Sequence, residues 1–314
     1  MQKLTSQRAL GIFAIVFSSL LWGTIPLILR QIDGSPFVKV FYRVFFSFLV
    51  LGIWLIVSGR WRTIKELDSF TIRWLLAQGA LLAINWILFF GAFDRADVAT
   101  VELLGYMGPV FVAMLAPFLL KYRFDKRIII PLLLSLLGML IVLVPHGLGF
   151  SSDIYAMIGA IMALASALTY ALLIIMAKRI LTVAPIDILT MFESMGASVL
   201  LLPFVLVSYR QGNVPTGGVT PYLMLFMLGA FHTAMTGVLF FYGLKQLRPE
   251  QAVIFTYVEP VSAIAFAMLF LGEPLTWFVV LGGILVVIGG TIVARHDAEE
   301  GIETTPIEAP TVEI

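Results

Sequence analysis

Four ionisable side chains lie inside long apolar stretches of the chain. Arg43, Glu102, Glu193 and Glu259 each interrupt a run of about 20 mostly apolar residues, which is the length that crosses a bilayer. A charge within hydrocarbon is costly, so it normally faces a partner charge, a bound solute or a water-filled space. The chemistry that these residues can do is therefore recognition of a charged solute or transfer of a proton.

Glu102 and Arg43 are placed at similar depths of two neighbouring apolar stretches. Glu102 lies about one helical turn from the start of its stretch and Arg43 about two turns from the start of its own. Two explanations remain open. The pair forms a structural salt bridge or a gate, which we favour, or Glu102 meets a substrate amine or a proton. At helical spacing Glu102 shares a face with Tyr106 and Pro109.

Glu259 lies near the middle of another stretch and directly precedes Pro260. Proline has no N–H, so the carbonyl of Thr256 loses its helical partner and the helix is expected to kink. A carboxylate beside a free carbonyl suits a cation or a proton. The alternative, given equal weight, is that Glu259 bonds the backbone or a nearby hydroxyl such as that of Thr236 or Ser262.

Glu193 and His232 have more structural explanations. Glu193 is expected to pair with Lys178 or Arg179, as an ion pair or part of a gate. His232 titrates near neutral pH in its unperturbed state. A single histidine in a membrane helix is more often a hydrogen-bonded packing residue.

Aromatic and polar residues occupy matching places in the two halves of the chain. Trp22 matches Tyr170, and Tyr106 matches Tyr257. Aromatic rings around a central axis would hold a cation or a ring, and the alternative is packing between helices. The predicted substrate-binding residues are Trp22, Asn85, Trp86, Glu102, Tyr106, Tyr170, His232, Thr236, Tyr257 and Glu259.

Ten stretches are long and apolar enough to position these residues as membrane helices. They cover residues 9–29, 36–58, 72–93, 98–120, 128–145, 154–177, 184–208, 220–244, 249–271 and 275–294. Only 12% of the residues are charged, against roughly 25% in soluble domains. The predicted fold is an all-α integral membrane protein, and the bilayer is its main partner.

Positive charge alternates between the predicted loops and indicates the orientation of the chain in the membrane. Fifteen of the twenty Lys and Arg residues lie at the termini or in the even-numbered loops, four lie in the odd-numbered loops, and the last is Arg43. Cytoplasmic loops carry this excess. Both termini are therefore predicted to be cytoplasmic, in a multi-pass protein of the cell (inner) membrane.

The chain repeats itself at an offset of 151 residues. Tyr106-Met-Gly-Pro109-Val falls on Tyr257-Val-Glu-Pro260-Val, and Gly138 falls on Gly289. Five helices per repeat is an odd number, so the second repeat must cross the membrane in the opposite sense. The predicted organisation is a first repeat over residues 1–150, an inverted repeat over 151–296, and an acidic disordered tail over 297–314. Inverted repeats are typical of secondary transporters, with the substrate near the midplane between them.

The motifs that mark several other function classes do not occur in the sequence. There is no cysteine, and no phosphate loop, metal-ligand pair or nucleophile triad occurs. We therefore expect no enzyme activity, no cofactor and no metal. A formal net charge of +1 without a basic, aromatic-rich run gives no case for nucleic acid.

The pattern resembles the drug/metabolite transporter superfamily in its EamA-type branch. The match lies in Tyr257-Val-Glu259-Pro260, in Leu271-Gly272-Glu273-Pro274, and in the paired glycines of the last stretch. In the first half, Lys121-Tyr122-Arg123 departs from the Gly-Glu turn of the family. The resemblance covers residues 9–295 and implies ten helices, alternating access and a small organic solute.

The leading hypothesis is a secondary-active exporter or exchanger of small metabolites, mainly amino acids or related amines, with protons as a candidate coupling ion. The alternatives are an importer of a larger metabolite such as a nucleotide conjugate, and a receptor or scaffold without transport. The sequence predicts no oligomeric state.

Overall fold

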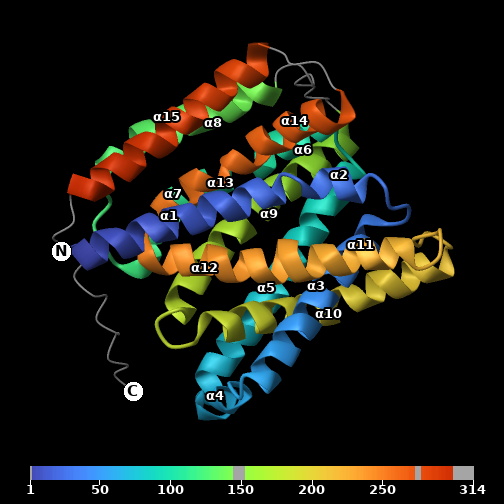
Figure 1. Ribbon diagram of the computed structural model, residues 1–314. Coiled ribbons are helices and arrows are strands. Elements are labelled where there is room, and N and C mark those ends of the chain that lie inside the picture. The colour runs from blue at the N-terminus through green and yellow to red at the C-terminus, as the bar shows by residue number, and fades with distance from the viewer. Residues whose placement is uncertain (1, 144–152, 273–276, 300–314) are drawn as a thin grey trace.

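The computed structural model describes residues 2–143, 153–272 and 277–299. Over these residues the chain is helical and contains no strand. Figure 1 shows the helices as a bundle with α8 and α15 paired along one side. The helices α3 and α10 pack together on the opposite side, and α1, α9, α12 and α13 lie between. The predicted all-α fold is confirmed.

The helices of the first half are α1 (Gln2–Trp22), α2 (Ile25–Leu29), α3 (Pro36–Val57), α4 (Trp61–Glu66), α5 (Ser69–Phe93), α6 (Val98–Gly105), α7 (Gly108–Leu120), η1 (Lys126–Ile128) and α8 (Ile129–Leu143). The helices of the second half are α9 (Ile154–Ile180), α10 (Ile186–Arg210), α11 (Thr220–Gly229), the π-helix η3 (Ala230–Met235), α12 (Thr236–Gln246), α13 (Pro249–Thr256), α14 (Val258–Leu271) and α15 (Trp277–Glu299).

Eight helical segments of the described chain are long and apolar enough to cross a membrane. They coincide with eight of the ten predicted spans. The other two predicted spans correspond to α8, with 15 residues, and to α15, whose apolar stretch is Val280–Arg295. Large apolar side chains cover the outside of the bundle, with Val57 and Phe118 each 80% exposed and Trp277 79% exposed. Such a surface needs hydrocarbon around it, so the chain is an integral membrane protein.

Polar residues begin several helices at the points where the chain leaves the apolar runs. The side chain of Asp68 accepts a hydrogen bond from the Thr71 N–H, and Asp97 does the same for Thr100. These bonds satisfy N–H groups that a helix start leaves without partners. The side-chain and backbone hydrogen bonds from Thr71 lower the pKa of Asp68 below its usual value.

Three spans of the described chain are broken, and each break is followed by a proline. The first span stops at Gly23 and Thr24, before Pro26, and resumes as α2. The predicted span over 9–29 is confirmed as one of the eight segments, but its helix is broken at this point, because Pro26 has no N–H to continue the hydrogen-bond ladder. Gly23 also packs against α14, where a Cβ would lie 3.0 Å from the Glu259 carbonyl oxygen.

The other two breaks occur at matching places of the two halves. Helix α6 gives way to α7 at Tyr106 and Met107, and α13 gives way to α14 at Tyr257. The kink predicted from Pro260 is confirmed. Each span then ends on a residue with left-handed backbone, Lys121 with φ 58° and Gly272 with φ 70°.

The last helix runs further than predicted. It was expected to end at residue 294, but α15 continues to Glu299, since no glycine or proline interrupts the chain before Gly301. The rest of the predicted acidic tail, 300–314, lies outside the described residues.

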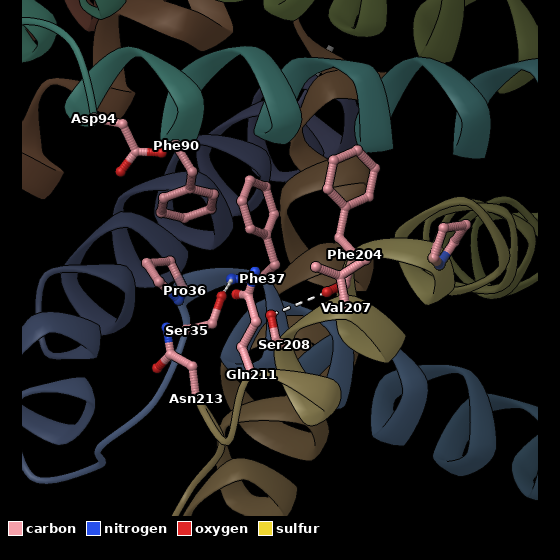
Figure 2. Close-up of a pocket in the computed structure, with 11 residues that line it drawn as sticks. Ser35, Pro36, Phe37, Phe90, Asp94, Phe204, Val207, Ser208, Gln211 and Asn213 are labelled. Atoms are coloured by element: carbon pink, nitrogen blue, oxygen red, sulfur yellow. Dashed lines mark hydrogen bonds between the residues drawn. The ribbon is translucent and has the colours of Figure 1, made fainter.

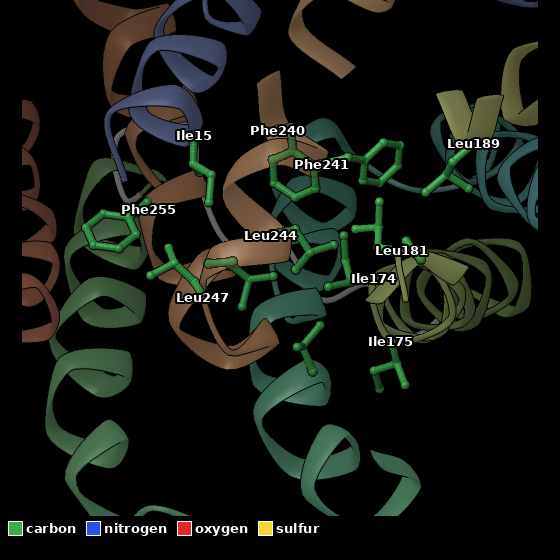
Figure 3. Packing of buried hydrophobic residues seen from close by; sticks show 14 of the residues in the cluster. Ile15, Ile174, Ile175, Leu181, Leu189, Phe240, Phe241, Leu244, Leu247 and Phe255 are labelled. Atoms are coloured by element: carbon green, nitrogen blue, oxygen red, sulfur yellow. The ribbon is translucent and has the colours of Figure 1, made fainter. Parts of the chain in front are cut away.

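A continuous apolar core joins helices from both halves. Figure 3 shows Ile15 of α1, Phe240 and Leu244 of α12, and Phe255 of α13 packed beside residues of α9. Phe240 and Phe241 are almost fully buried in this core. The core fixes α1, α9, α12 and α13, and these helices position Trp22, Tyr170, Thr236 and Tyr257 of the predicted site.

Close approach of α8 and α15 depends on glycine, which gives a test of the fold. A Cβ at Gly138 would lie 2.5 Å from the Gly282 carbonyl oxygen, and one at Gly289 would lie 2.7 Å from that of Pro131. We expect Gly138→Leu and Gly289→Leu each to lower the free energy of unfolding by about 1–3 kcal/mol, the usual cost of overpacking. The measurement is thermal unfolding in detergent, with Gly52→Leu as control, because nothing lies within 4 Å of a Cβ there. Equal melting temperatures for all three variants would contradict this packing.

Candidate functional site

Tyr106 and Tyr257 meet where their helices break. The Tyr257 hydroxyl donates a 3.0 Å hydrogen bond to the Tyr106 carbonyl, and the ring centres are 6.5 Å apart. A broken turn leaves carbonyls without helical partners. Here Tyr257 of the second half supplies a hydrogen-bond donor to the Tyr106 carbonyl. Tyr257 is fully buried, whereas Tyr106 is partly exposed. The predicted tyrosine pair is therefore brought together.

Tyr170 of α9 lies between the same two breaks. A Cβ on Gly108, at the start of α7, would lie 2.6 Å from the Tyr170 ring, so glycine is needed for this contact. The Tyr170 hydroxyl interacts with Thr256, the last residue of α13. Tyr170 thus contacts the start of α7 with its ring and the end of α13 with its hydroxyl.

The two predicted carboxylates and Arg43 form a charged cluster near these tyrosines. The charge of Glu259 interacts with those of both Arg43 and Glu102, and the Glu102 carboxyl also interacts with the Tyr106 hydroxyl. All three charged residues are partly exposed although they lie within membrane spans. Three charges from α3, α6 and α14 are thus able to act on one bound solute.

Contacts of the cluster revise two of the predicted pairings. No ion pair joins Glu102 to Arg43 among the described residues, and the charge that acts on Arg43 most directly is that of Glu259. The predicted salt bridge between Glu102 and Arg43 is wrong, since depth in the membrane does not fix which way a helix faces. The Ser262 hydroxyl donates to the backbone carbonyl of Glu259 at 2.8 Å, and no side chain of the described residues hydrogen bonds the Glu259 carboxylate.

Trp22, Thr236 and His232 form a second polar group between α1 and the π-helix. Trp22 Nε1 donates to Thr236 Oγ1 at 2.8 Å and to the His232 carbonyl at 3.1 Å. His232 Nε2 lies 2.9 Å from Thr24 Oγ1, in the break of the first span. A π-turn leaves a helix locally wide and often marks a functional site. Here it presents one carbonyl to Trp22.

Two predicted site residues lie elsewhere and pack helices together. Asn85 Nδ2 donates to the carbonyl and hydroxyl of Ser166 and to Thr169 Oγ1, at 2.7–3.1 Å, and thereby joins α5 to α9. Trp86 packs against the apolar cluster that contains Val40 and Leu201. Neither of these two residues contacts the charged cluster among the described interactions, so the prediction of a binding role finds no support for them.

Glu193 also has a partner that the sequence did not indicate. Gln78 Nε2 donates to Glu193 Oε1 at 2.8 Å and, more weakly, to the Leu173 carbonyl at 3.3 Å. The amide is fully buried between α5, α9 and α10. Glu193 is therefore held away from the charged cluster.

The expected partners of Glu193 serve as helix caps. Lys178 Nζ donates to carbonyls at the end of α12, including that of Leu247 at 2.7 Å, and Arg179 donates to the Leu119 carbonyl. The prediction that Glu193 pairs with either cation is wrong. Both cations instead donate to backbone carbonyls that lack helical partners at helix ends, and not to the Glu193 carboxylate.

A cavity that sequence reasoning missed lies between α3, α5 and α10. Its volume is about 520 Å³, and its lining includes Phe37, Phe90 and Phe204. The Phe37 ring centre is 5.0 Å from that of Phe204 and 6.2 Å from that of Phe90. Figure 2 shows Asp94 beside Phe90 on α5 and Gln211 below Phe37. None of the predicted site residues lines this cavity.

Thr24 and Gln78 are polar residues of the interior that the sequence analysis did not select. The signal for Thr24 was its place two residues before Pro26, which forecasts a break. Gln78 is an uncharged amide in an apolar run and carried no comparable signal. Among the described residues, no group of three or more His, Cys, Asp or Glu is arranged to hold a metal ion.

Comparisons with known proteins agree with this architecture. The sequence matches the EamA-like transporter family twice, over residues 9–144 and 157–295. An uncharacterized transporter of Archaeoglobus fulgidus is 30% identical over 288 residues, covering 91% of this chain and 97% of the relative. The transporter YxxF of Bacillus subtilis is 25% identical over 97% of this chain and 96% of its own length.

Two further comparisons extend the likeness. Protein RarD of Salmonella typhi is 24% identical over 85% of this chain and 88% of its own length. A crystal structure with 18% identity superposes with a TM-score of 0.75, covering 93% of this chain and 98% of the other. The structural likeness establishes a shared fold.

The separation of packing residues from site residues predicts a stability difference. We expect Asn85→Ala to lower the free energy of unfolding by about 1 kcal/mol, as for other hydrogen bonds between membrane helices. Thermal unfolding in detergent measures this loss. The control is Thr291→Ala, because that exposed hydroxyl bonds only its own helix, at Val287. If Asn85→Ala melted at the same temperature as the control, the assigned packing role would be wrong.

Proposed function

Because the chain belongs to the EamA-like transporter family and is thus a membrane transporter, we propose that it is a secondary carrier of amino acids or related amines. It exports or exchanges them by alternating access across the cell membrane. The observation that carries this proposal is the charged cluster of Glu102, Glu259 and Arg43 beside two broken helices. Charges are kept within membrane spans when they serve a substrate or ion path.

The composition of the cluster favours a substrate that carries an ammonium group. Glu102 and Glu259 are carboxylates, and they exceed the positive charge of Arg43 by one. A bound ammonium satisfies a carboxylate through a charge-assisted hydrogen bond. A proton taken up by either glutamate would balance the remaining charge when the substrate itself is neutral overall, so protons are the coupling ion that we favour.

Pairs of helix contacts support an arrangement of two inverted repeats, 1–150 and 151–296. At the offset of the repeat, α5 corresponds to α12 and α9 corresponds to α1. The contact of α5 with α9 is matched by the contact of α12 with α1. The contact of α7 with α9 is likewise matched by that of α14 with α1. A pseudo-two-fold axis in the membrane plane requires such pairs, and it would pass between Tyr106 and Tyr257.

Contacts between the repeats at both ends of the bundle provide candidate gates. At the end that we assign to the cytoplasm, the Tyr122 hydroxyl donates to the Glu250 carboxylate, and Arg248 lies 3.7 Å from Asp125. Burial and the nearby Glu250 charge raise the pKa of Tyr122 well above its usual value, so Tyr122 stays a donor. At the other end the Tyr42 and Tyr209 hydroxyls are 2.7 Å apart.

The proposal is tested by counterflow in liposomes. Purified protein is reconstituted with an internal mixture of unlabelled amino acids and monoamines, and the entry of each labelled compound is measured. We expect wild-type protein to accumulate at least one amino acid or amine. Glu259→Gln should reduce that rate at least tenfold, because an amide cannot pair with an ammonium or carry a proton. Its stability should be retained, since no side chain in the described structure hydrogen bonds the Glu259 carboxylate.

Glu66→Gln is the matched control, because Glu66 is exposed on the short helix α4 and outside the cluster. This variant should transport at the wild-type rate. Wild-type liposomes that moved no compound above protein-free liposomes would contradict the proposed carrier function. Full transport by Glu259→Gln would contradict the role given to the cluster.

A further inference from the structure

We propose that Arg43 binds the carboxylate of the transported compound, so that the site selects α-amino acids over the corresponding simple amines. This inference rests on the proposed carrier function and goes further by naming the substrate class and the residue that selects it. The sequence predicts only a gate or an ion-pair role for Arg43.

Arg43 lies within a membrane span, where a charge without a partner is costly. Arg43 is the eighth residue of α3, so it lies about 10 Å along the helix from the first residue. Helix α3 packs closely on the neighbouring span at this level, since a Cβ at Gly229 would lie 2.7 Å from the Arg43 carbonyl oxygen. The guanidinium lies near the π-helix, because its Nη2 contacts Thr233 of η3.

The guanidinium lacks most of the acceptors that it can use. A guanidinium carries five N–H donors in a flat fork. In the described structure Nη2 of Arg43 makes one long bond of 3.4 Å, to Thr233 Oγ1, and the buried Nε–H has no acceptor. A buried charged donor without an acceptor is costly. The arrangement makes physical sense if a ligand supplies the missing oxygens.

The surrounding charges define what kind of ligand fits. Glu259 is near enough to interact with Arg43, yet no carboxylate forms an ion pair with Arg43 among the described residues. Glu102 interacts with Glu259, and His232 lies within range of the Arg43 charge. The cluster thus presents a cationic fork and a free carboxylate near each other but not joined.

An α-amino acid matches this arrangement because it carries both charges on one carbon. Its carboxylate can accept two parallel hydrogen bonds from the Arg43 fork, and its ammonium can reach Glu259. A simple amine satisfies Glu259 but leaves the guanidinium without its acceptors. Rejection of an analogue that leaves a buried polar group unpaired is strong.

The test compares amino acids with their decarboxylated amines on the full-length protein. Each of the common L-amino acids and its amine, for example phenylalanine and phenethylamine, is titrated in a thermal-shift assay in detergent, because a bound ligand stabilises the fold. We expect the amino acids that bind wild-type protein to do so at least tenfold more tightly than their amines. Arg43→Met should abolish that difference, and Arg43→Lys should weaken amino-acid binding at least tenfold, since lysine lacks the bidentate fork.

Lys39→Met is the matched control. Lys39 is a cation one turn earlier on the same helix, where it donates to the Leu29 carbonyl at 3.3 Å, and its loss should leave the selectivity unchanged. Equal binding of amines and amino acids by wild-type protein, or full selectivity in Arg43→Lys and Arg43→Met, would overturn the role of Arg43 alone. If neither class of compound bound or was transported, the carrier function would fall together with this inference.

Discussion

Every polar group within the bilayer core must find its partner inside the protein, and this constraint governs the whole structure. Unbroken helices meet it by themselves, since their backbone groups bond within the helix. The three broken spans and the π-helix do not, so each brings exposed carbonyls that other residues must satisfy. Tyr257 supplies a hydroxyl to the Tyr106 carbonyl, and Trp22 supplies its indole N–H to the His232 carbonyl. The interior polar groups are therefore placed by the irregularities of the helices.

The same constraint separates structural charges from those available to a ligand. Lys178 is fully engaged with carbonyls at the end of α12, and Glu193 has its amide partner in Gln78. Among the described residues, Arg43 has one long bond to Thr233 and an Nε–H without an acceptor, and no side chain hydrogen bonds the Glu259 carboxylate. An unpaired charge in a membrane interior is costly. We therefore assign the functional role to these two residues and not to Lys178 or Glu193.

Features that depend on local sequence could be predicted, and features that depend on helix rotation could not. The spans followed from the lengths of apolar runs, and the break at Tyr257 followed from Pro260 in the same turn. The partners of Glu193 and Arg43 depend on which way each helix faces, and in long uniformly apolar helices the sequence leaves that rotation undetermined. The π-helix at residues 230–235 also had no signal, because one extra residue in a turn changes neither composition nor spacing. The cavity between α3, α5 and α10 arises only from packing.

In the proposed mechanism, two inverted halves move against each other around the charged cluster. The absence of cysteine allows spin labels to be placed at chosen cysteine pairs without a prior cysteine-removal step. One pair, at residues 123 and 245, reports on the end assigned to the cytoplasm, and the other, at residues 31 and 211, reports on the opposite end. We expect addition of a transported compound to shift the two distance distributions in opposite directions. Distances that both stayed fixed, or that rose and fell together, would contradict alternating access.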